Sequence, residues 1–141
     1  MIKTTISLAE ARKRIGNWLK FLSGTPTFKD KQDMIPRALF ISFDDIKELE
    51  KDCAKNYKKD ELIGIRVYFG LAEQLDGVTG SDYALRGMVV PVLKSPKSAC
   101  GTDAVHHNLA DPDPNYTNIY DFTSPCPKYC DDESELYITE G

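Results

Sequence analysis

Large apolar residues occupy every second position within Leu62-Ile63-Gly64-Ile65-Arg66-Val67-Tyr68-Phe69-Gly70-Leu71. This period of two is typical of a β-strand that buries one face. A stretch rich in Gly and Asp follows at residues 76–82 and predicts a turn. Residues 83–93 again favour a strand, so we expect the two segments to pair as an antiparallel hairpin. Because Pro91 cannot donate to a strand ladder, we expect it at an edge or a bulge.

A first amphipathic helix is predicted near the N-terminus. Ser7 and Glu10 form a capping box, in which each side chain can bond the other's backbone amide. Apolar side chains recur at helical spacing behind it, which predicts a helix over residues 8–22. Gly24 and Pro26 then end the helix.

A second helix is predicted after a short apolar run at residues 38–41, which we expect to be a buried strand. Ser42 caps this helix, and Asp44 and Asp45 lie in its first turn, where acidic side chains suit the helix dipole. Cys53 belongs to the apolar stripe of the helix, so we expect it in the core.

The last third of the chain has no comparable pattern. Residues 94–118 show no periodicity, while 119–122 and 136–138 are candidates for short strands. The order of elements predicts a single α+β domain over residues 1–141, with a loop-rich segment at 94–135. We expect a mainly antiparallel sheet of three to five strands with both helices packed on one face. The other face needs a cover, which the C-terminal segment or a second subunit would supply.

The predicted core consists of apolar residues from both helices and both hairpin strands. They are Leu8, Ile15, Trp18, Leu19, Leu22, Phe40, Ile46, Leu49, Ile65, Val67, Phe69, Val90 and Val92. Arg66, Tyr68, Tyr83 and Arg86 can occupy the outward face of the hairpin. Tyr and Arg are enriched at binding hot spots, but they also suit the polar side of a half-covered sheet, which we favour.

The composition is that of an ordinary globular protein, with 41% apolar and 28% charged residues. The net charge of −4 argues against a nucleic-acid partner. The charge is uneven, because residues 1–60 carry 13 basic and 9 acidic side chains whereas residues 61–141 carry 5 and 13. No apolar run approaches the ~18 residues that span a bilayer, which argues against a membrane protein. The N-terminus lacks the apolar segment of a secretory signal, so we expect a cytoplasmic protein with reduced cysteines.

Three of the four cysteines and both histidines lie in the last third of the chain. Structural zinc sites use cysteine pairs two to four residues apart, and three residues separate Cys126 from Cys130. A second arm would come from Cys100 with His106 or His107, which completes a tetrahedral set. Zinc is therefore the cofactor that these residues would hold, but ordinary buried or surface thiols are the interpretation that we favour.

The same cysteines allow two further hypotheses. A three-residue spacer closes a disulfide if the two Cα atoms come within about 7 Å, which would give a redox pair. Cys100 or Cys126, with a histidine and an acid such as Asp103, supplies the parts of a thiol-dependent enzyme. No nucleophile elbow or phosphate-binding glycine pattern accompanies them. We therefore assign no catalytic residue.

Several short motifs occur together in this chain: Ile35-Pro36-Arg37-Ala38, the strand Gly64–Gly70, Val89-Val90-Pro91-Val92, and a Tyr-Asp-Phe segment followed by Pro-Cys-Pro. In this order the chain resembles, over residues 35–130, small bacterial proteins of unknown function. The resemblance implies a bacterial, cytoplasmic, single-domain protein and transfers no activity or site residue. The leading hypothesis is a non-enzymatic binding or accessory module that recognises a protein partner or itself, through the sheet face or the acidic C-terminal region. A structural zinc protein and a thiol-dependent enzyme are the alternatives.

Overall fold

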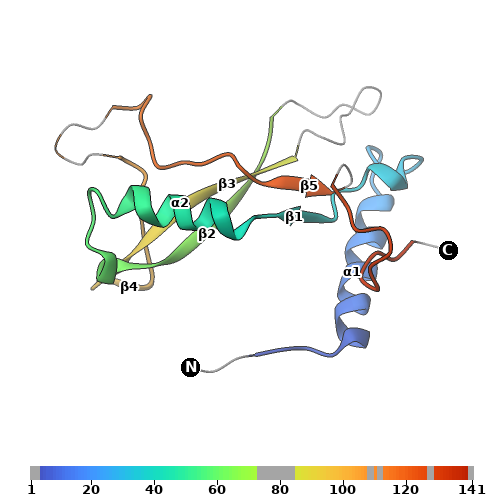
Figure 1. Ribbon diagram of the computed structural model, residues 1–141. Helices are drawn as coiled ribbons and strands as arrows, with labels where there is room; N and C mark the ends of the chain where they lie inside the picture. Colours follow the sequence, from blue (N-terminus) through green and yellow to red (C-terminus); the bar gives the residue numbers. More distant parts are fainter. Residues whose placement is uncertain (1–3, 73–84, 108–109, 111–112, 127–128, 140–141) are drawn as a thin grey trace. The chain divides into compact units, whose positions relative to one another are not determined.

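The computed structural model describes residues 4–72, 85–107, 110, 113–126 and 129–139. Its elements in chain order are α1 (Leu8–Ser23), the 3-10 turn η1 (Gln32–Met34), β1 (Ala38–Phe40), α2 (Phe43–Cys53), the 3-10 turn η2 (Lys59–Glu61), β2 (Leu62–Leu71), β3 (Leu85–Ser95), β4 (Ser98–Asp103) and β5 (Ser124–Cys126) (Figure 1). One sheet has the strand order β2-β3-β4, and β1 pairs with β5 in a second sheet. Two helices and two small antiparallel sheets confirm the predicted α+β class. The predicted turn at residues 76–82 lies outside the described residues.

The chain divides into two compact units. The first holds the described residues up to Leu39, those within Leu71–Leu85 and those from Pro125 onward, and the second holds Phe40–Gly70 and Arg86–Ser124. Apart from Leu71 of β2 and Leu85 of β3, the larger sheet belongs to the second unit together with α2, whereas α1 belongs to the first. That both helices cover one face of the sheet stays a prediction for α1, as does the single domain. No helix in the described part of the chain is long and apolar enough to cross a membrane.

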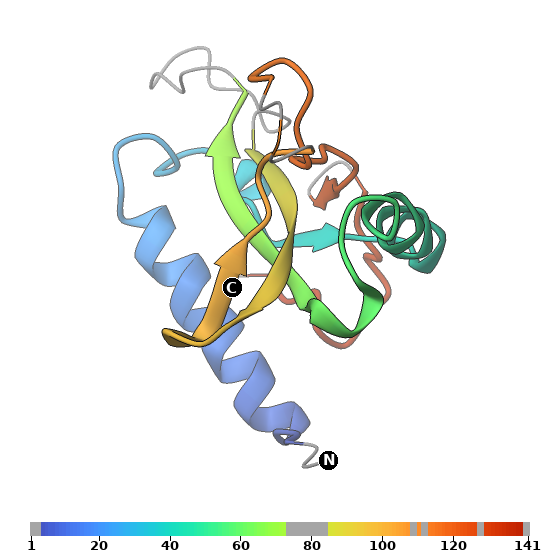
Figure 2. The same ribbon diagram turned by 90° about the vertical axis from the view of Figure 1, so that its left-hand side faces the viewer.

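The core of the second unit lies between α2 and the sheet. Leu49 and Cys53 of α2 are buried against Val89 of β3. The partly buried residues around them are Ile41, Leu62, Val67, Tyr120 and Phe122. Figure 2 shows the three strands of this sheet, with α2 beside them. The prediction that Cys53 is a core residue is confirmed.

β3 is the middle strand and is buried along most of its length. Val89 and Pro91 are buried, and so are Val90 and Val92 between and beyond them. Because alternate residues of a strand face opposite sides, β3 is covered on both faces. The prediction that Pro91 lies at an edge or bulge is wrong. β3 pairs with β4 from Val92 to Ser95, and the Pro91 oxygen accepts from the backbone amide of Ala104 at 2.9 Å. Pro91 therefore lies at the end of that ladder within the middle strand, where its missing N–H is tolerated.

β4 is a strand that the sequence analysis did not anticipate, within the segment predicted to lack regular structure. It pairs antiparallel with β3, with Val92 opposite Asp103. Gly101 has a left-handed backbone with φ of 77°. A Cβ there would lie 2.4 Å from Cγ1 of Val92 and 2.8 Å from the backbone oxygen of Leu93. Only glycine permits this close approach of β4 to β3.

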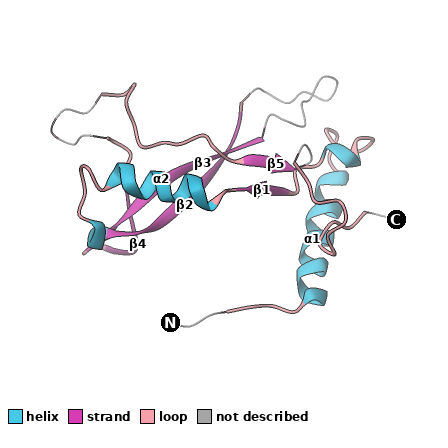
Figure 3. Cartoon of the chain, in the orientation of Figure 1, coloured by secondary structure: helices cyan, strands magenta, loops and turns pink. Residues whose placement is uncertain are grey.

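The segment after β4 runs as loops across the second unit (Figure 3). The backbone of Tyr120 exchanges two hydrogen bonds with Val89, of 2.9 and 2.8 Å. Asn118 is buried, and its side-chain amide donates to the backbone oxygen of Ala104 at 2.9 Å. The predicted strand at 119–122 is therefore reduced to an isolated bridge at Tyr120, and residues 136–138 form no strand.

In the first unit, α1 begins as the capping analysis predicted, since the Ser7 hydroxyl accepts from the backbone amide of Glu10 at 3.1 Å. Leu19 of α1 and Ile35 are both buried. Trp18 is instead 46% exposed, because its indole N–H donates to the backbone oxygen of Pro36 at 2.7 Å. This polar contact holds the ring at the surface of the unit.

The predicted core is correct in part. Leu19, Leu49, Val90 and Val92 are buried, and the partly buried members are Ile15, Leu22, Ile46 and Val67. The predictions for five others are wrong, because they are exposed: Leu8, Trp18, Phe40, Ile65 and Phe69. The last two belong to β2, so the error there concerns the strand with the clearest apolar alternation.

Candidate functional site

β2 exposes much of its apolar face. Val67 packs against the core formed by α2 and β3, but Ile65 on one side of it is 38% exposed and Phe69 on the other is 74% exposed. Ile65, Val67 and Phe69 alternate along the strand and share one face. The apolar face of β2 thus continues beyond the part that its own unit covers.

β2 is also an edge strand. In the order β2-β3-β4 its one neighbour is β3. Within the described residues, β2 makes no backbone hydrogen bond to a segment outside that sheet. As far as the structure describes the chain, the outer edge therefore presents backbone N–H and C=O groups along a strand of 10 residues. Natural edge strands are commonly short, charged or interrupted by proline, whereas β2 has one charged residue and no proline.

The polar side chains of β2 form a network with β4. The Arg66 guanidinium pairs with the carboxylate of Asp103 and donates to the backbone oxygen of Cys100. The Tyr68 hydroxyl donates to the other carboxylate oxygen of Asp103. The single positive charge of β2 is thereby neutralised within the unit. Next to this network, a Cβ added to Gly64 would meet nothing within 4 Å, so the surface over that residue is open.

A second cluster of polar residues surrounds His107. Its Nδ1 lies 3.1 Å from Oδ1 of Asn118, and its Nε2 lies 3.2 Å from Nδ2 of Asn56. Since the Asn118 oxygen is an acceptor, this network assigns the proton to Nδ1 and leaves Nε2 to accept from Asn56. This tautomer satisfies both contacts. The ring also packs on Tyr116, with centroids 4.1 Å apart.

Asp52 connects this cluster to the core. The Tyr120 hydroxyl donates to Oδ2 of Asp52 at 2.6 Å, and this hydrogen bond lowers the pKa of the carboxyl group. Burial, together with the adjacent carboxylate, raises the pKa of Tyr120, so the phenol stays protonated. Burial likewise raises the pKa of the Cys53 thiol to about 11. These shifts move the pKa values of Asp52, Cys53 and Tyr120 away from neutral pH.

A cavity of about 330 Å³ adjoins Asp52 on the surface of the second unit. Its lining residues are Asp45, Glu48, Leu49, Lys51, Asp52, Lys55, Tyr120 and Phe122. Lys55 lies 3.5 Å from the Asp52 carboxylate and compensates its charge. The paired charges suit a packing defect between α2 and the segment after β4. The lining residues place no nucleophile beside a base.

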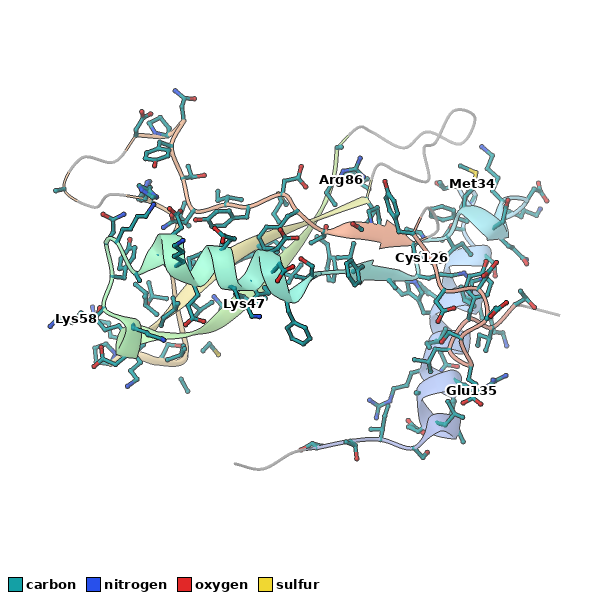
Figure 4. The ribbon with its side chains drawn as sticks, viewed as in Figure 1. Met34, Lys47, Lys58, Arg86, Cys126 and Glu135 are labelled. Carbon is teal, nitrogen blue, oxygen red and sulfur yellow. A yellow bond between two sulfur atoms is a disulfide. The ribbon has the colours of Figure 1, made fainter. Side chains whose placement is uncertain are left out.

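The predicted zinc ligands are distributed over both units. Cys126 and Cys130, in the first unit, form a disulfide with Cα atoms 4.8 Å apart (Figure 4). A turn closed by the Tyr129 amide donating to the Pro125 oxygen at 2.9 Å brings them together. The expectation of reduced thiols is therefore wrong for this pair, and it holds for Cys53 and Cys100, which are free.

The other candidates lie in the second unit. Cys100 is exposed on β4, and the backbone oxygen of His106 accepts from the Tyr57 hydroxyl at 2.8 Å. His107 is occupied by the two asparagines described above. In the described ranges, no three His, Cys, Asp or Glu side chains gather closely enough to hold a metal ion. The zinc site stays a prediction, which metal analysis of protein purified under reducing conditions checks.

Sequence reasoning identified the residues of β2 but assigned their apolar side to the core. A comparison of the number of apolar strand faces with the number of helices and loops that can cover them could have predicted that part of β2 is exposed. β2 and β3 both carry apolar side chains, but the core formed with α2 buries Val89 of β3 and leaves Ile65 and Phe69 of β2 exposed. The chain matches no protein-family model, no curated protein and no solved structure.

Proposed function

We propose that this protein is a non-enzymatic binding module whose edge strand β2 accepts an extended strand from a protein partner. The observation that carries the proposal is the coincidence, on one strand, of a backbone edge that pairs with no other described segment and of exposed apolar side chains. Strand addition uses both features, because the backbone edge supplies hydrogen bonds and alternate side chains supply specificity.

The side chains of β2 define the chemistry of the incoming strand. Ile65 and Phe69 offer apolar surface on one face, so the partner strand carries apolar residues at alternate positions. Arg66 and Tyr68 offer a guanidinium and an aromatic ring on the other, with Asp103 holding both in place. These two groups favour a tyrosine or another aromatic residue on the partner.

The polar cluster around His107 stabilises the fold, which leaves the β2 edge as the candidate for binding. Its hydrogen bonds connect Asn56, just after α2, to Asn118 in the segment that covers β3. The pKa values of Cys53 and Tyr120 lie above their ordinary values, which is the opposite of what a nucleophile or base at neutral pH requires. We assign this cluster to structure and the β2 edge to binding.

A peptide titration tests the proposal. The probe is a fluorescently labelled peptide with the β2 sequence, residues 62–71, extended by lysines for solubility. We expect saturable anisotropy with the full chain. The variant Phe69→Lys removes an apolar contact and places a charge there, so it weakens binding by at least about tenfold.

The matched control is Phe43→Glu, which changes an apolar side chain that is 85% exposed in the same unit at the start of α2. This variant is expected to bind the peptide as the parent chain does. A flat titration up to about 1 mM peptide, which corresponds to negligible affinity, would contradict the proposal. Equal binding by the parent chain and Phe69→Lys would contradict it as well.

A further inference from the structure

We infer that the strand that completes this sheet is β2 of a second copy of the chain, paired antiparallel about a two-fold axis at Val67. The inference rests on the proposed function and names the partner. It follows from the self-complementary order of side chains along β2, taken together with their exposure.

Symmetry restricts the registers available to such a pair. Two copies of one strand that continue a sheet are related by a two-fold axis perpendicular to it, so each copy keeps the same face on the same side. Directly opposed residues of antiparallel strands also share a face. The axis must therefore pass through a residue, which faces its own copy, and not between two residues.

An axis at Val67 pairs seven residues, 64–70, with favourable partners throughout. On the apolar face, Val67 meets its own copy and Ile65 meets Phe69. On the other face, Arg66 meets Tyr68 and Gly64 meets Gly70. Each unlike pair occurs twice by symmetry, so exposed Ile65 and exposed Phe69 are both covered.

The neighbouring registers are worse. An axis at Arg66 sets the two arginines directly against each other, and like charges at opposed positions are destabilising. An axis at Tyr68 shortens the ladder within residues 64–70 and no longer opposes Ile65 to Phe69. The register at Val67 is the one that opposes the single cation to an aromatic ring.

Two features of the surface fit this register. Tyr68 of the second copy lies diagonal to Gly64, and aromatic side chains reach diagonal positions across a strand pair. A Cβ at Gly64 would meet nothing within 4 Å, so there is room for that ring. Asp103 neutralises Arg66 within each copy. The pair of β2 strands therefore brings together no uncompensated charge, despite the net charge of −4 on each chain.

The association is tested by the mass of the full chain in solution. A single strand pair buries a small interface, so we expect dissociation constants on the order of micromolar or weaker. Sedimentation from about 5 μM to about 500 μM should show the mass rising from 15.8 kDa toward twice that value. Ile65→Glu and Phe69→Lys, each alone, should shift the midpoint upward by at least about tenfold. Phe43→Glu should leave the midpoint unchanged.

Mixing the two variants tests the register. In a mixed dimer, the glutamate introduced by Ile65→Glu faces the lysine introduced by Phe69→Lys, and the second such pair keeps its native Ile and Phe. An equimolar mixture should therefore dimerise at lower concentration than either variant alone. The double variant Ile65→Glu/Phe69→Lys should also regain association. Far-UV circular dichroism verifies that each variant is folded.

The outcomes separate this inference from the proposed function. If the parent chain stays at 15.8 kDa throughout yet binds the β2 peptide, the second-copy inference is overturned and the binding module stands. If the chain dimerises but the two single variants do so equally well, the dimer uses another surface and the inference is again overturned. If mixing gives no recovery, the register at Val67 is wrong. A monomer that also ignores the peptide overturns both proposals.

Discussion

β2 and β3 are neighbours in one sheet and are both rich in apolar side chains, yet β3 is buried and β2 is largely exposed. Val89 and Val90 of β3 are almost inaccessible, whereas Ile65 and Phe69 of β2 are exposed. The difference arises from position, since β3 has a strand on each side and the segment at Tyr120 beside it. Apolar alternation identifies a face that avoids water, but it does not say whether the chain itself covers that face.

The comparison is tested most severely by placing the same charge on each strand. Val89→Asp puts a carboxylate in the centre of the core, which should destabilise the fold by at least about 4 kcal/mol. Phe69→Asp, measured below the concentration at which the chain associates, should change stability by less than about 1 kcal/mol because the site already faces water. Urea unfolding followed by circular dichroism gives both values. Comparable losses for the two variants would show that β2 is covered in solution.

Gly101 on β4 and Gly64 on β2 test the same difference between closely packed and exposed positions. Gly101→Ala on β4 combines a left-handed backbone with a Cβ 2.4 Å from Val92, so it should destabilise by about 2–3 kcal/mol. Gly64→Ala on β2 meets no neighbour, so it should be neutral or stabilise by up to about 1 kcal/mol through the unfolded chain. Thermal unfolding of both variants compares the closely packed glycine on β4 with the open one on β2. A destabilised Gly64→Ala would be evidence against open space above β2.

Sequence reasoning succeeded where the determining interactions are local. Ser7 and Ser42 each accept a backbone hydrogen bond from the residue three positions later, and α1 and α2 begin where these caps predict. The hairpin strands were also predictable from their period. β4 was not, because Ser98–Asp103 has no apolar alternation and forms a strand through its pairing with β3.

The candidate site was predictable in composition but not in exposure. Arg66 and Tyr68 were recognised as an outward pair, but their shared partner Asp103 comes from β4, which no local pattern indicates. The disulfide between Cys126 and Cys130 depends on a turn at Pro125 whose closure the spacing permits without requiring. Long-range pairing thus determined each feature that local patterns missed.

The smallest expected effect concerns the segment at Tyr120 that covers β3. The hydrogen bond from the Tyr120 hydroxyl to Asp52 connects this segment to α2. Tyr120→Phe keeps the ring and the backbone bridge to Val89 but removes the donor. The expected loss is about 1 kcal/mol near neutral pH, at the low end for a bond to a carboxylate because Asp52 is partly solvated.

The pH dependence of this loss follows from the two pKa shifts. The Tyr120 hydroxyl lowers the pKa of Asp52 below its ordinary 3.8, so the ionised carboxylate stabilises the fold above that pH, and this contribution is lost as the pH falls through the lowered value. Burial and the carboxylate raise the pKa of Tyr120 above its ordinary 10.0, so its contribution is complete below pH 10 and is lost as the pH rises through the raised value.

The difference in unfolding free energy between the parent chain and Tyr120→Phe should therefore be constant between about pH 4 and pH 10. It should decrease below pH 4 and above pH 10. Denaturant unfolding across this range measures it. Tyr116→Phe, which changes an exposed tyrosine packed on His107, is the matched control and should show no narrowing in acid. A difference that stays constant down to pH 2.5 would mean that Asp52 does not hold the covering segment on β3. In that case the bridge at Val89, and not the carboxylate, would be what separates the covered strand from the open one.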